Sequence, residues 1–283
     1  MELHRIEPER ELDLLREFLA ASDPQDYLLD DIEEWVRDGR LWAGVDEGSW
    51  VAFGRVHDLG HGQGWVSGLR VAPSHRGRGV GGRFLDGLLA DARAIGLTEV
   101  RAVIDDGNRA SRQLFTRHRF RPVLEMTLRR APARRSAAEL LRPATPGDHL
   151  TGPVGWIPGV SGRADLLPGS DGGRLGRWDP RLPDRWVQEH KLYLGPCLAA
   201  AVQVDWQRQP RTMWVNPLQG EPASLFPALT ALAAALGQDE WQAYLPSTEP
   251  LRRVYADLGL TPHAHWGDRI HLYERAENGT ALT

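Results

Sequence analysis

The chain has 283 residues, a formal net charge of −4, 41% hydrophobic residues and 25% charged residues. This length suits two α/β domains of ordinary size, and the composition is typical of globular proteins. The small negative charge argues against a nucleic-acid or membrane partner, and the single cysteine, Cys197, excludes an intramolecular disulfide.

Apolar segments are short throughout the sequence. The N-terminus has no apolar signal segment, and the most apolar stretch, 225–236, is interrupted by Pro227 and is too short to span a membrane. Cys197 lies in an apolar run from 194 to 204, which predicts a small core residue rather than a nucleophile. No Cys/His cluster has the spacing of a structural zinc site. We therefore expect a cytoplasmic protein that binds no metal.

The first half of the chain alternates between helix and strand patterns. Apolar residues recur at helical spacing after Pro8 and between 80 and 95, and short apolar runs bounded by turn residues indicate strands. The order β-α-α-β-β-β-α-β-α-β predicts a mixed α/β domain. The expected strands are 3–6, 41–45, 50–56, 65–71, 100–104 and 123–128, and the expected helices are one from residue 8 and those at 31–38, 80–95 and 109–117.

A second unit follows a short connection. Residues 131–139 are rich in Arg, Ala, Pro and Ser, which indicates a linker between a domain at 1–130 and another at 140–283. Beyond this linker the expected strands are 198–204, 213–215, 241–245 and 270–274, and the expected helices are 224–236 and 251–258.

The two halves share a sequence pattern. Residues 95–104 have a counterpart at 236–245, and Val-Ala-Pro at 71–73 matches Val-Asn-Pro at 215–217. We interpret the pattern as an internal duplication, although two α/β domains can share such an order by chance.

Residues 71–82, Val-Ala-Pro-Ser-His-Arg-Gly-Arg-Gly-Val-Gly-Gly, join an expected strand to an expected helix. A helix start offers unpaired N–H groups and the positive end of the helix dipole. Glycines let the backbone approach a phosphate, and arginines add donors suited to its oxygens. The segment therefore predicts an anion site that suits a diphosphate.

Two better-known phosphate loops fit this segment poorly. A mononucleotide P-loop ends in Gly-Lys-Ser/Thr, and this loop has no lysine. A dinucleotide-binding loop follows the first strand of a parallel sheet, whereas hairpin-connected strands precede this loop.

The stretch Leu-Arg-Val-Ala-Pro-x-x-Arg-Gly-x-Gly-Val-Gly at 69–81 resembles motif A of the Gcn5-related N-acetyltransferase (GNAT) superfamily. Residues 108–120, from Asn-Arg-Ala-Ser-Arg-Gln-Leu-Phe to Phe120, resemble motif B of the same superfamily, at the expected spacing. The resemblance covers 1–130 well and 140–283 only in outline. It implies the acyl-CoA N-acyltransferase fold, a mixed α/β sheet, in two tandem GNAT-like domains of which the second is degenerate.

The resemblance also implies acetyl-CoA as co-substrate. Its pantetheine arm would lie between two strands that splay apart, the one ending at Val71 and the one ending near Ile104. Backbone groups of the first strand would pair with pantetheine, and the glycine loop would hold the pyrophosphate. The residues implied to contact coenzyme A are Leu69, Arg70, Val71, Arg76, Gly77, Arg78, Gly79, Val80, Gly81, Gly82, Asn108, Ser111 and Phe115.

Two positions depart from the family pattern. Phe115 stands where the family often has a tyrosine that acts as the acid, and the strand 65–71 lacks the family's glutamate base. Ser67 is the only hydroxyl of that strand. A thiolate is a tolerable leaving group, so the protein needs no acid if water protonates the thiolate. Positioning of the two reactants alone can supply much of the rate enhancement.

A base elsewhere in the chain is the competing explanation. Asp105 and His57 end expected strands and join Ser67 as catalytic candidates. Each has a simpler interpretation: Asp105 and Asp106 as caps of the helix that starts near Arg109, and His57 as a hairpin surface residue. His118, beside Phe115, has the sequence context of a solvated helix end.

Three functions remain open at this point. The first is acetyl transfer to a primary amine of a small molecule or peptide, the second is non-catalytic acyl-CoA binding or sensing, and the third is transfer of another acyl group or to a hydroxyl. The second half lacks the glycine loop, and Glu221 and Pro222 at the matching position disfavour a pyrophosphate. We expect one coenzyme A site per chain, in a monomer or a homodimer.

Overall fold

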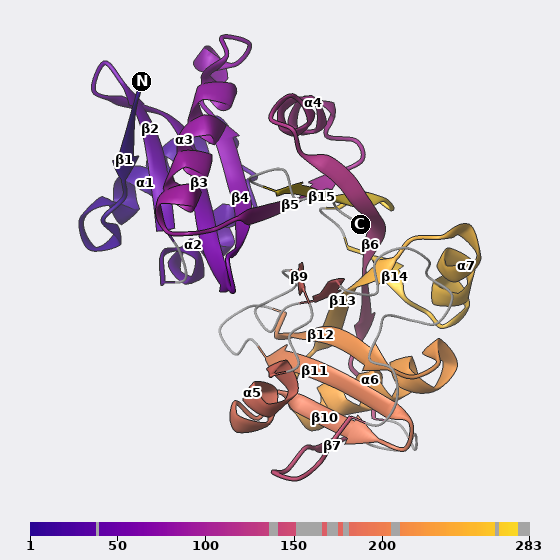
Figure 1. The fold of residues 1–283 in the computed structure, drawn as a ribbon. Coiled ribbons are helices and arrows are strands. Elements are labelled where there is room, and N and C mark those ends of the chain that lie inside the picture. Colours follow the sequence, from indigo (N-terminus) through magenta and orange to yellow (C-terminus); the bar gives the residue numbers. More distant parts are fainter. Residues whose placement is uncertain are drawn as a thin grey trace. The chain divides into compact units, whose positions relative to one another are not determined.

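The computed structural model describes residues 1–37, 40–135, 141–150, 166–168, 175–177, 181–204, 210–263 and 266–276. The expected helix end at Asp38 and residues 136–139 of the expected linker lie outside this part of the chain. The chain forms two compact units (Figure 1). Unit 1 contains Met1–Ile104, Asn108–Pro122 and Leu272–Thr283, and unit 2 contains Asp105–Gly107 and Val123–His271.

Unit 1 is a mixed sheet with helices on both faces. Its strand order is β1-β2-β3-β4-β5-β15, in which β1 to β4 are antiparallel neighbours and β5 is parallel to β4. The strands are β1 (Glu2–Arg5), β2 (Arg40–Asp46), β3 (Ser49–Gly60), β4 (Gln63–Val71), β5 (Glu99–Asp105) and β15 (Ile270–Ala276). The helices are α1 (Pro8–Ser22), α2 (Leu28–Arg37), a 3-10 turn η1 (Pro73–His75), α3 (Val80–Ala94) and α4 (Arg109–Arg117).

Each face of this sheet has its own hydrophobic core. On one face, α3 buries an apolar stripe at helical spacing, which includes Phe84, Leu85, Leu88 and Leu89. On the other face, α1 and α2 bury residues such as Leu15 and Ile32 against β2 and β3. The mixed α/β fold predicted from the element order is confirmed.

Unit 2 repeats much of this plan. Its strand order is β6-β13-β12-β11-β10-β7, with β14 paired to β6, and β12 is parallel to β13. The strands are β6 (Arg121–Pro132), β7 (Arg142–Pro143), β10 (Leu192–Gly195), β11 (Leu198–Val204), β12 (Thr212–Gln219), β13 (Glu240–Pro246), β14 (Thr261–Pro262) and a separate pair, β8 (Leu166–Pro168) with β9 (Leu175–Arg177). The helices are α5 (Leu182–Gln188), α6 (Pro222–Ala235) and α7 (Glu249–Asp257).

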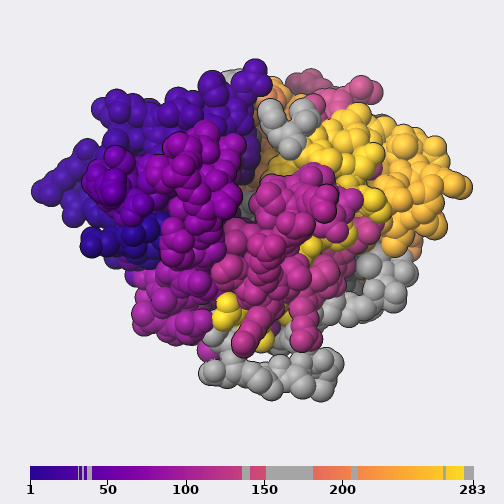
Figure 2. Space-filling model, turned by 90° about the horizontal axis from the view of Figure 1, so that it is seen from above, coloured from indigo at the N-terminus to yellow at the C-terminus, as the bar shows by residue number. Residues whose placement is uncertain are grey.

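The last strand of the chain belongs to the sheet of the first unit. β15 follows β14 in sequence, but it is the neighbour of β5 (Figure 1). Tyr273 of β15 packs in the same core as α3. In Figure 2, yellow atoms from the end of the described chain lie among the magenta atoms of the β5–α4 region. The domain boundaries expected from the sequence, 1–130 and 140–283, stay a prediction.

The position of Cys197 corrects one expectation. The residue lies in the two-residue turn between β10 and β11, has a φ of 55° and is exposed, so the predicted core cysteine is wrong. The apolar run that suggested burial is two strands, and the turn between them places the thiol outside.

We expect the Cys197 thiol to react with a disulfide reagent such as dithionitrobenzoate in the native protein, because an exposed thiol needs no unfolding to react. Native and denatured protein should each release one equivalent of the coloured thiol, with the native reaction complete in minutes. A native protein that reacts only after denaturation would contradict the exposed placement. Cys197→Ser is the matching control.

Candidate functional site

The glycine loop ends at the start of α3. Gly79 is the N-cap residue with a φ of 75°, Gly77 has a φ of 72°, and no side chain caps the helix. The first-turn N–H groups, from Val80 to Gly82, have no acceptor within the helix. A Cβ on Gly77 would meet no atom within 4 Å, so the space beside the loop is open. The loop thus presents several N–H donors and the positive end of the α3 dipole to an anion.

Two arginines near the loop bind its backbone. The Nε of Arg76 donates to the carbonyl oxygen of Val71 at 3.0 Å, and Nη1 of Arg83 donates to the carbonyl of Arg78 at 3.3 Å. Arg76 therefore braces the strand-to-helix connection. Among the loop glycines, Gly77 faces open space, whereas a Cβ on Gly79 would lie 3.4 Å from Nη1 of Arg83.

Strands β4 and β5 separate beside this loop. They pair in parallel only through Gln63–Trp65 of β4 and Glu99–Arg101 of β5. Beyond this pairing β4 continues to Val71 and β5 to Asp105, with no ladder between them in the described residues. We call this divergence the fork. Its facing backbone N–H and C=O groups are available to a ligand that lies between the strands, because backbone polar groups need partners.

A β-bulge interrupts β4 inside the fork. Arg55 of β3 lies opposite Ser67, and Phe53 lies opposite Arg70, so two steps on β3 match three on β4. Gly68, at the bulge, has a φ of 68°. The extra residue turns both Ser67 and Arg70 to the α1–α2 face, although they are three positions apart.

Two aromatic and charged groups cover the bulge on this face. A Cβ on Gly68 would lie 2.4 Å from Cζ3 of Trp35 on α2, so only glycine fits beneath that ring. The guanidinium of Arg55 lies 3.5 Å above the centroid of the same ring, and Nε of Arg55 donates to Oγ of Ser67 at 3.1 Å. Ser67, a catalytic candidate, is thus hydrogen-bonded to a buried arginine.

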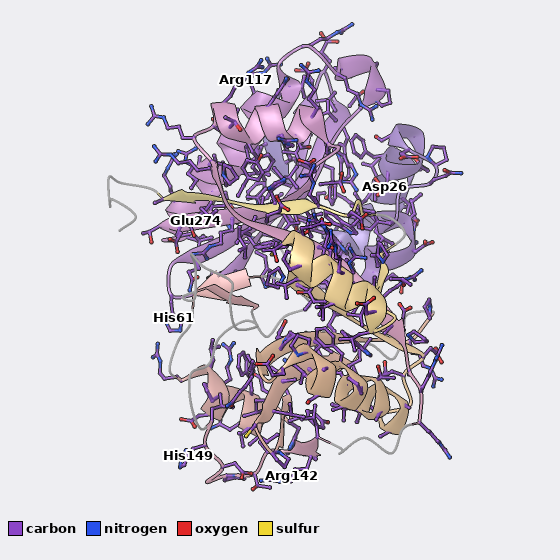
Figure 3. All side chains as sticks on the ribbon, turned by 90° about the vertical axis from the view of Figure 1, so that its right-hand side faces the viewer. Asp26, His61, Arg117, Arg142, His149 and Glu274 are labelled. Carbon is purple, nitrogen blue, oxygen red and sulfur yellow. The ribbon has the colours of Figure 1, made fainter. Side chains whose placement is uncertain are left out.

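Arg70 forms an ion pair with Asp26, which lies between α1 and α2 and is labelled in Figure 3. Its Nε and Nη2 donate to the two carboxylate oxygens at 2.5 and 2.9 Å. Burial is the largest single influence on the pKa of Arg70 and lowers it, but the hydrogen bonds and charge interactions with Asp26 and Tyr27 together outweigh burial, so the net shift raises this pKa. Arg70, expected among the coenzyme A contacts, therefore joins β4 to the α1–α2 connection through its side chain.

The other two catalytic candidates, His57 and Asp105, have surroundings that differ from those of Ser67. His57 is on β3, opposite Trp65 and two residues from Arg55, which places it on the same face as Arg55. Asp105 belongs to unit 2, and its carboxylate accepts backbone N–H groups of Gly107 at 2.7 Å and of Gly267 at 2.5 Å. These two bonds give Asp105 a role in fixing loops.

Helix α4 begins with Asn108 rather than with an aspartate cap. The Asn108 side chain accepts from the N–H of Ser111 at 3.0 Å, so the expected caps Asp105 and Asp106 are wrong. Asp106 instead bonds His271 at 3.0 Å and Arg269 at 3.1 Å. An Asn at the N-cap has the right geometry, since its short side chain reaches the N3 amide.

Replacement of Asn108 by Ala should lower the free energy of unfolding by about 1 kcal/mol, because the cap bond to Ser111 is lost. Asn108→Ser, which keeps a capping oxygen, should recover most of that loss. Chemical denaturation of the three proteins measures both effects. An equal loss in both variants would show that the cap does not stabilise α4.

Phe115 and His118 lie on α4 and at its end. Phe115 is buried and meets Phe120 edge-on at 4.9 Å between ring centroids. His118 is not the solvated residue expected: its side chain is 14% exposed, Nδ1 bonds the carbonyl of Leu114 at 2.8 Å, and Nε2 lies 3.4 Å from Asp86 of α3. Because α4 packs on α3, the helix end that the sequence suggested is covered.

Several residues of this site were not singled out by the sequence reasoning. Two sequence patterns could have indicated them. A glycine inside a strand often marks a bulge, and a charged residue inside an apolar strand needs a buried partner. The residues are Asp26, Trp35, Arg55 and Gly68.

The described residues contain no group of three or more His, Cys, Asp or Glu side chains that could hold a metal ion. None of the helices in the same part of the chain has the length and apolar character needed to cross a membrane.

Comparison with known proteins gives one family match. The model of the acetyltransferase (GNAT) family matches residues 9–120. A search of curated proteins finds no match. Among solved structures, the chain is similar to a proposed acetyltransferase from Thermoplasma acidophilum, with 17% identity, a TM-score of 0.59, and coverage of 98% of this chain and 100% of that one.

Two further structures show the same extent of likeness. A Gcn5-related N-acetyltransferase from Sphaerobacter thermophilus has 13% identity and a TM-score of 0.61, with 97% of this chain and 95% of that one covered. A proposed acetyltransferase from Pyrococcus horikoshii has 11% identity and a TM-score of 0.61, with 98% and 89% covered. At these identities the likeness shows a shared fold. The match to the model of the acetyltransferase (GNAT) family is a separate finding and covers residues 9–120.

Proposed function

We propose that unit 1 binds acetyl-CoA and transfers its acetyl group directly to a primary amine of a small molecule or peptide. The observation that carries the proposal is the fork between β4 and β5, which opens beside the uncapped, glycine-rich start of α3. A long ligand with a diphosphate at one end and amides along its arm suits both features. Coenzyme A has that chemistry.

We assign the following roles to residues of unit 1. N–H groups from Gly77 to Gly82 would hold the pyrophosphate, and the glycines at 77 and 79 permit the backbone conformation that exposes them. Backbone groups of Leu69 and Val71 in the fork would pair with the pantetheine amides. Asn108, Ser111 and Phe115 would line the far end of the arm, where bound acetyl-CoA supplies a reactive thioester.

The reaction forms a C–N bond and breaks the C–S bond of the thioester. The neutral amine attacks the thioester carbonyl carbon and then loses a proton to solvent or to a basic group, while coenzyme A leaves as a thiolate that takes a proton from water. Ser67, His57 and Asp105 remain the candidates for proton transfer, with Phe115 unable to donate a proton. Ser67 is bonded to Arg55, and Asp105 is bonded to two backbone amides. These contacts favour a structural role for both residues over proton transfer. We expect catalysis to depend mainly on proximity.

A non-catalytic acyl-CoA-binding or sensor protein is the alternative function. It is favoured by the absence of an acid at Phe115 and by the structural bonds of Asp105. Both functions need the same fork and loop. They differ in whether coenzyme A is released when an amine is present.

We further propose that the second half is a degenerate GNAT-like domain. β12 and β13 pair only through Thr212–Trp214 and Glu240–Gln242 and then diverge, as β4 and β5 do. The matching loop differs: a Cβ on Gly220, which has a φ of 128°, would lie 2.6 Å from Leu198, and no open space faces it. Glu221 is the N-cap residue of α6, and its negative charge at the helix start disfavours a phosphate there. The coenzyme A site is therefore assigned to unit 1 alone.

Isothermal titration with acetyl-CoA tests binding, and thiol release across a panel of primary amines tests transfer. The Cys197→Ser variant removes the protein's own thiol from that assay. Acetyl-CoA binding with amine-dependent release of coenzyme A is the expected result. Binding without release from any amine would favour the sensor, no binding would refute both, and faster release with propionyl or succinyl donors or with alcohols would identify another transfer. A cytoplasmic location, where acetyl-CoA is available, is part of the proposal.

A further inference from the structure

A buried polar cluster lies at the closed end of the fork. Arg101 of β5 is fully buried, and its guanidinium donates to three side chains from three strands. Nε donates to Glu274 of β15 at 2.7 Å, Nη1 donates to Gln63 of β4 at 2.7 Å, and Nη2 donates to Glu99 of β5. Glu274 is labelled on the yellow strand in Figure 3, and its side chain has no exposure to solvent.

The cluster coincides with the last ladder residues before the strands diverge. Trp65 opposite Arg101 is the final pair of the β4–β5 ladder, and Gln63 opposite Glu99 is the first. The guanidinium thus ties β4 and β5 together over their whole paired length. Because the strands diverge directly beyond it, a small rotation at Arg101 would move the open end of the fork by a larger distance.

The third strand of the cluster comes from the far end of the sequence. Glu274 lies 173 positions after Arg101, and β15 is the sheet neighbour of β5 on the side away from β4. The chemistry of the cluster is specific: a planar guanidinium can satisfy three directions at once, whereas an ammonium is a single point of charge. The cost of burying these charges is offset only if every partner stays in place.

Unit 2 offers an internal comparison. In its corresponding ladder, Thr212 lies opposite Glu240 and Trp214 opposite Gln242. Glu240 bonds Thr212 at 3.2 Å and lies 3.5 Å from Arg130 of β6, whose side chain is 34% exposed. Gln242, in the place of Arg101, has an Oε1 without a hydrogen-bond partner. The fork without a glycine loop therefore has a buried glutamine at its closed end, where the other fork has the Arg101 guanidinium with three hydrogen-bonded partners.

We propose that Arg101 and Glu274 are positioning residues for coenzyme A, which set the spacing of the fork for the pantetheine arm. This inference rests on the proposed function of the fork. It makes the C-terminal strand β15 part of the cofactor site of unit 1 without direct contact to the ligand. It also predicts different effects on the two ends of the ligand. The cluster would affect binding of the pantetheine arm, whereas the loop before α3 would bind the pyrophosphate independently of the cluster.

The test compares two ligands on the full chain. Acetyl-CoA engages both fork and loop, whereas 3′-phospho-ADP carries the pyrophosphate without the pantetheine arm. Arg101→Lys keeps the charge but loses the three-way geometry, and we expect it to raise the Kd of acetyl-CoA about tenfold while the Kd of 3′-phospho-ADP stays within about twofold. Glu274→Gln keeps the side-chain shape and should give the same selective loss in milder form.

Arg40→Lys is the matched control. Arg40 lies on β2, two strands from β4, and binds Asp91 of α3 through two nitrogens, at 3.0 and 2.7 Å. The same substitution there breaks a two-point ion pair away from the fork, and both ligands should bind as in the wild type. Equal weakening of the two ligands in Arg101→Lys and Glu274→Gln, or no change in either, would overturn the positioning role. Failure of the proposed function looks different, because the wild-type chain would then not bind acetyl-CoA.

Discussion

Gly77→Asp should weaken acetyl-CoA binding by about two orders of magnitude, which corresponds to about 2.7 kcal/mol. Gly77 has a φ of 72° in the loop, a conformation that Asp adopts more readily than other residues with a side chain. A Cβ there would meet no atom within 4 Å, so the side chain needs no rearrangement of the fold. The new carboxylate would stand beside the proposed pyrophosphate and repel it. Isothermal titration measures the Kd directly.

Two further variants separate charge from backbone strain. Gly77→Asn has the same shape without the charge and should cost only a few-fold in Kd. Gly48→Asp places the same residue in the β2–β3 turn, where Gly48 has a φ of 76° and a Cβ would also meet nothing within 4 Å. It should leave the Kd unchanged. If Gly77→Asp binds acetyl-CoA as tightly as Gly48→Asp does, the loop does not hold the pyrophosphate.

The sequence predicts most of unit 1 because its signals are local. The apolar stripe of α3, the glycines before it and the hairpin between β2 and β3 are decided by residues within a few positions of one another. The glycine loop has the strand-to-helix setting that the pattern at 71–82 indicates. For the same reason the order of elements in residues 1–128 agrees with the structure.

The parts that sequence reasoning missed depend on distant partners. β15 reads as a strand from its own residues, but nothing within 270–276 says that its neighbour is β5. The burial of Arg101 depends on its hydrogen bond to Glu274, which lies 173 positions later in the sequence. The exposed Cys197 was misjudged because a two-residue turn split one apolar run into β10 and β11. In unit 2, short elements such as β7 and β14 have too few residues for a periodic pattern.

The catalytic candidates illustrate the same limit. Ser67 and His57 were chosen by residue type and strand position, and the structure places both on the α1–α2 face of the sheet. The bulge that brings Ser67 and Arg70 to one face is a register shift, which alternation along β4 alone does not reveal. Gly68, a glycine inside the strand, is the local sequence signal for this bulge.

Gly68→Ala should destabilise unit 1 by about 3 kcal/mol, because two separate penalties add. The φ of 68° costs a residue with a Cβ about 1–2 kcal/mol, and overpacking against Trp35 costs about 1–3 kcal/mol more. The measurement is the free energy of unfolding from chemical denaturation. Gly48→Ala isolates the first penalty, since it has a similar φ and no neighbouring atom.

A double-mutant cycle with Trp35→Leu isolates the second penalty. The smaller side chain leaves room for a methyl group at position 68, so the two changes together should cost less than the sum of the single changes, by about 1–2 kcal/mol. Additive costs would show that the ring of Trp35 does not restrict the bulge. Coupling would show that α2, through Trp35, fixes the backbone of β4 inside the fork. Gly68 would then connect the packing of α2 to the backbone of β4 in the fork. A change in α2 would alter the proposed coenzyme A site through this glycine.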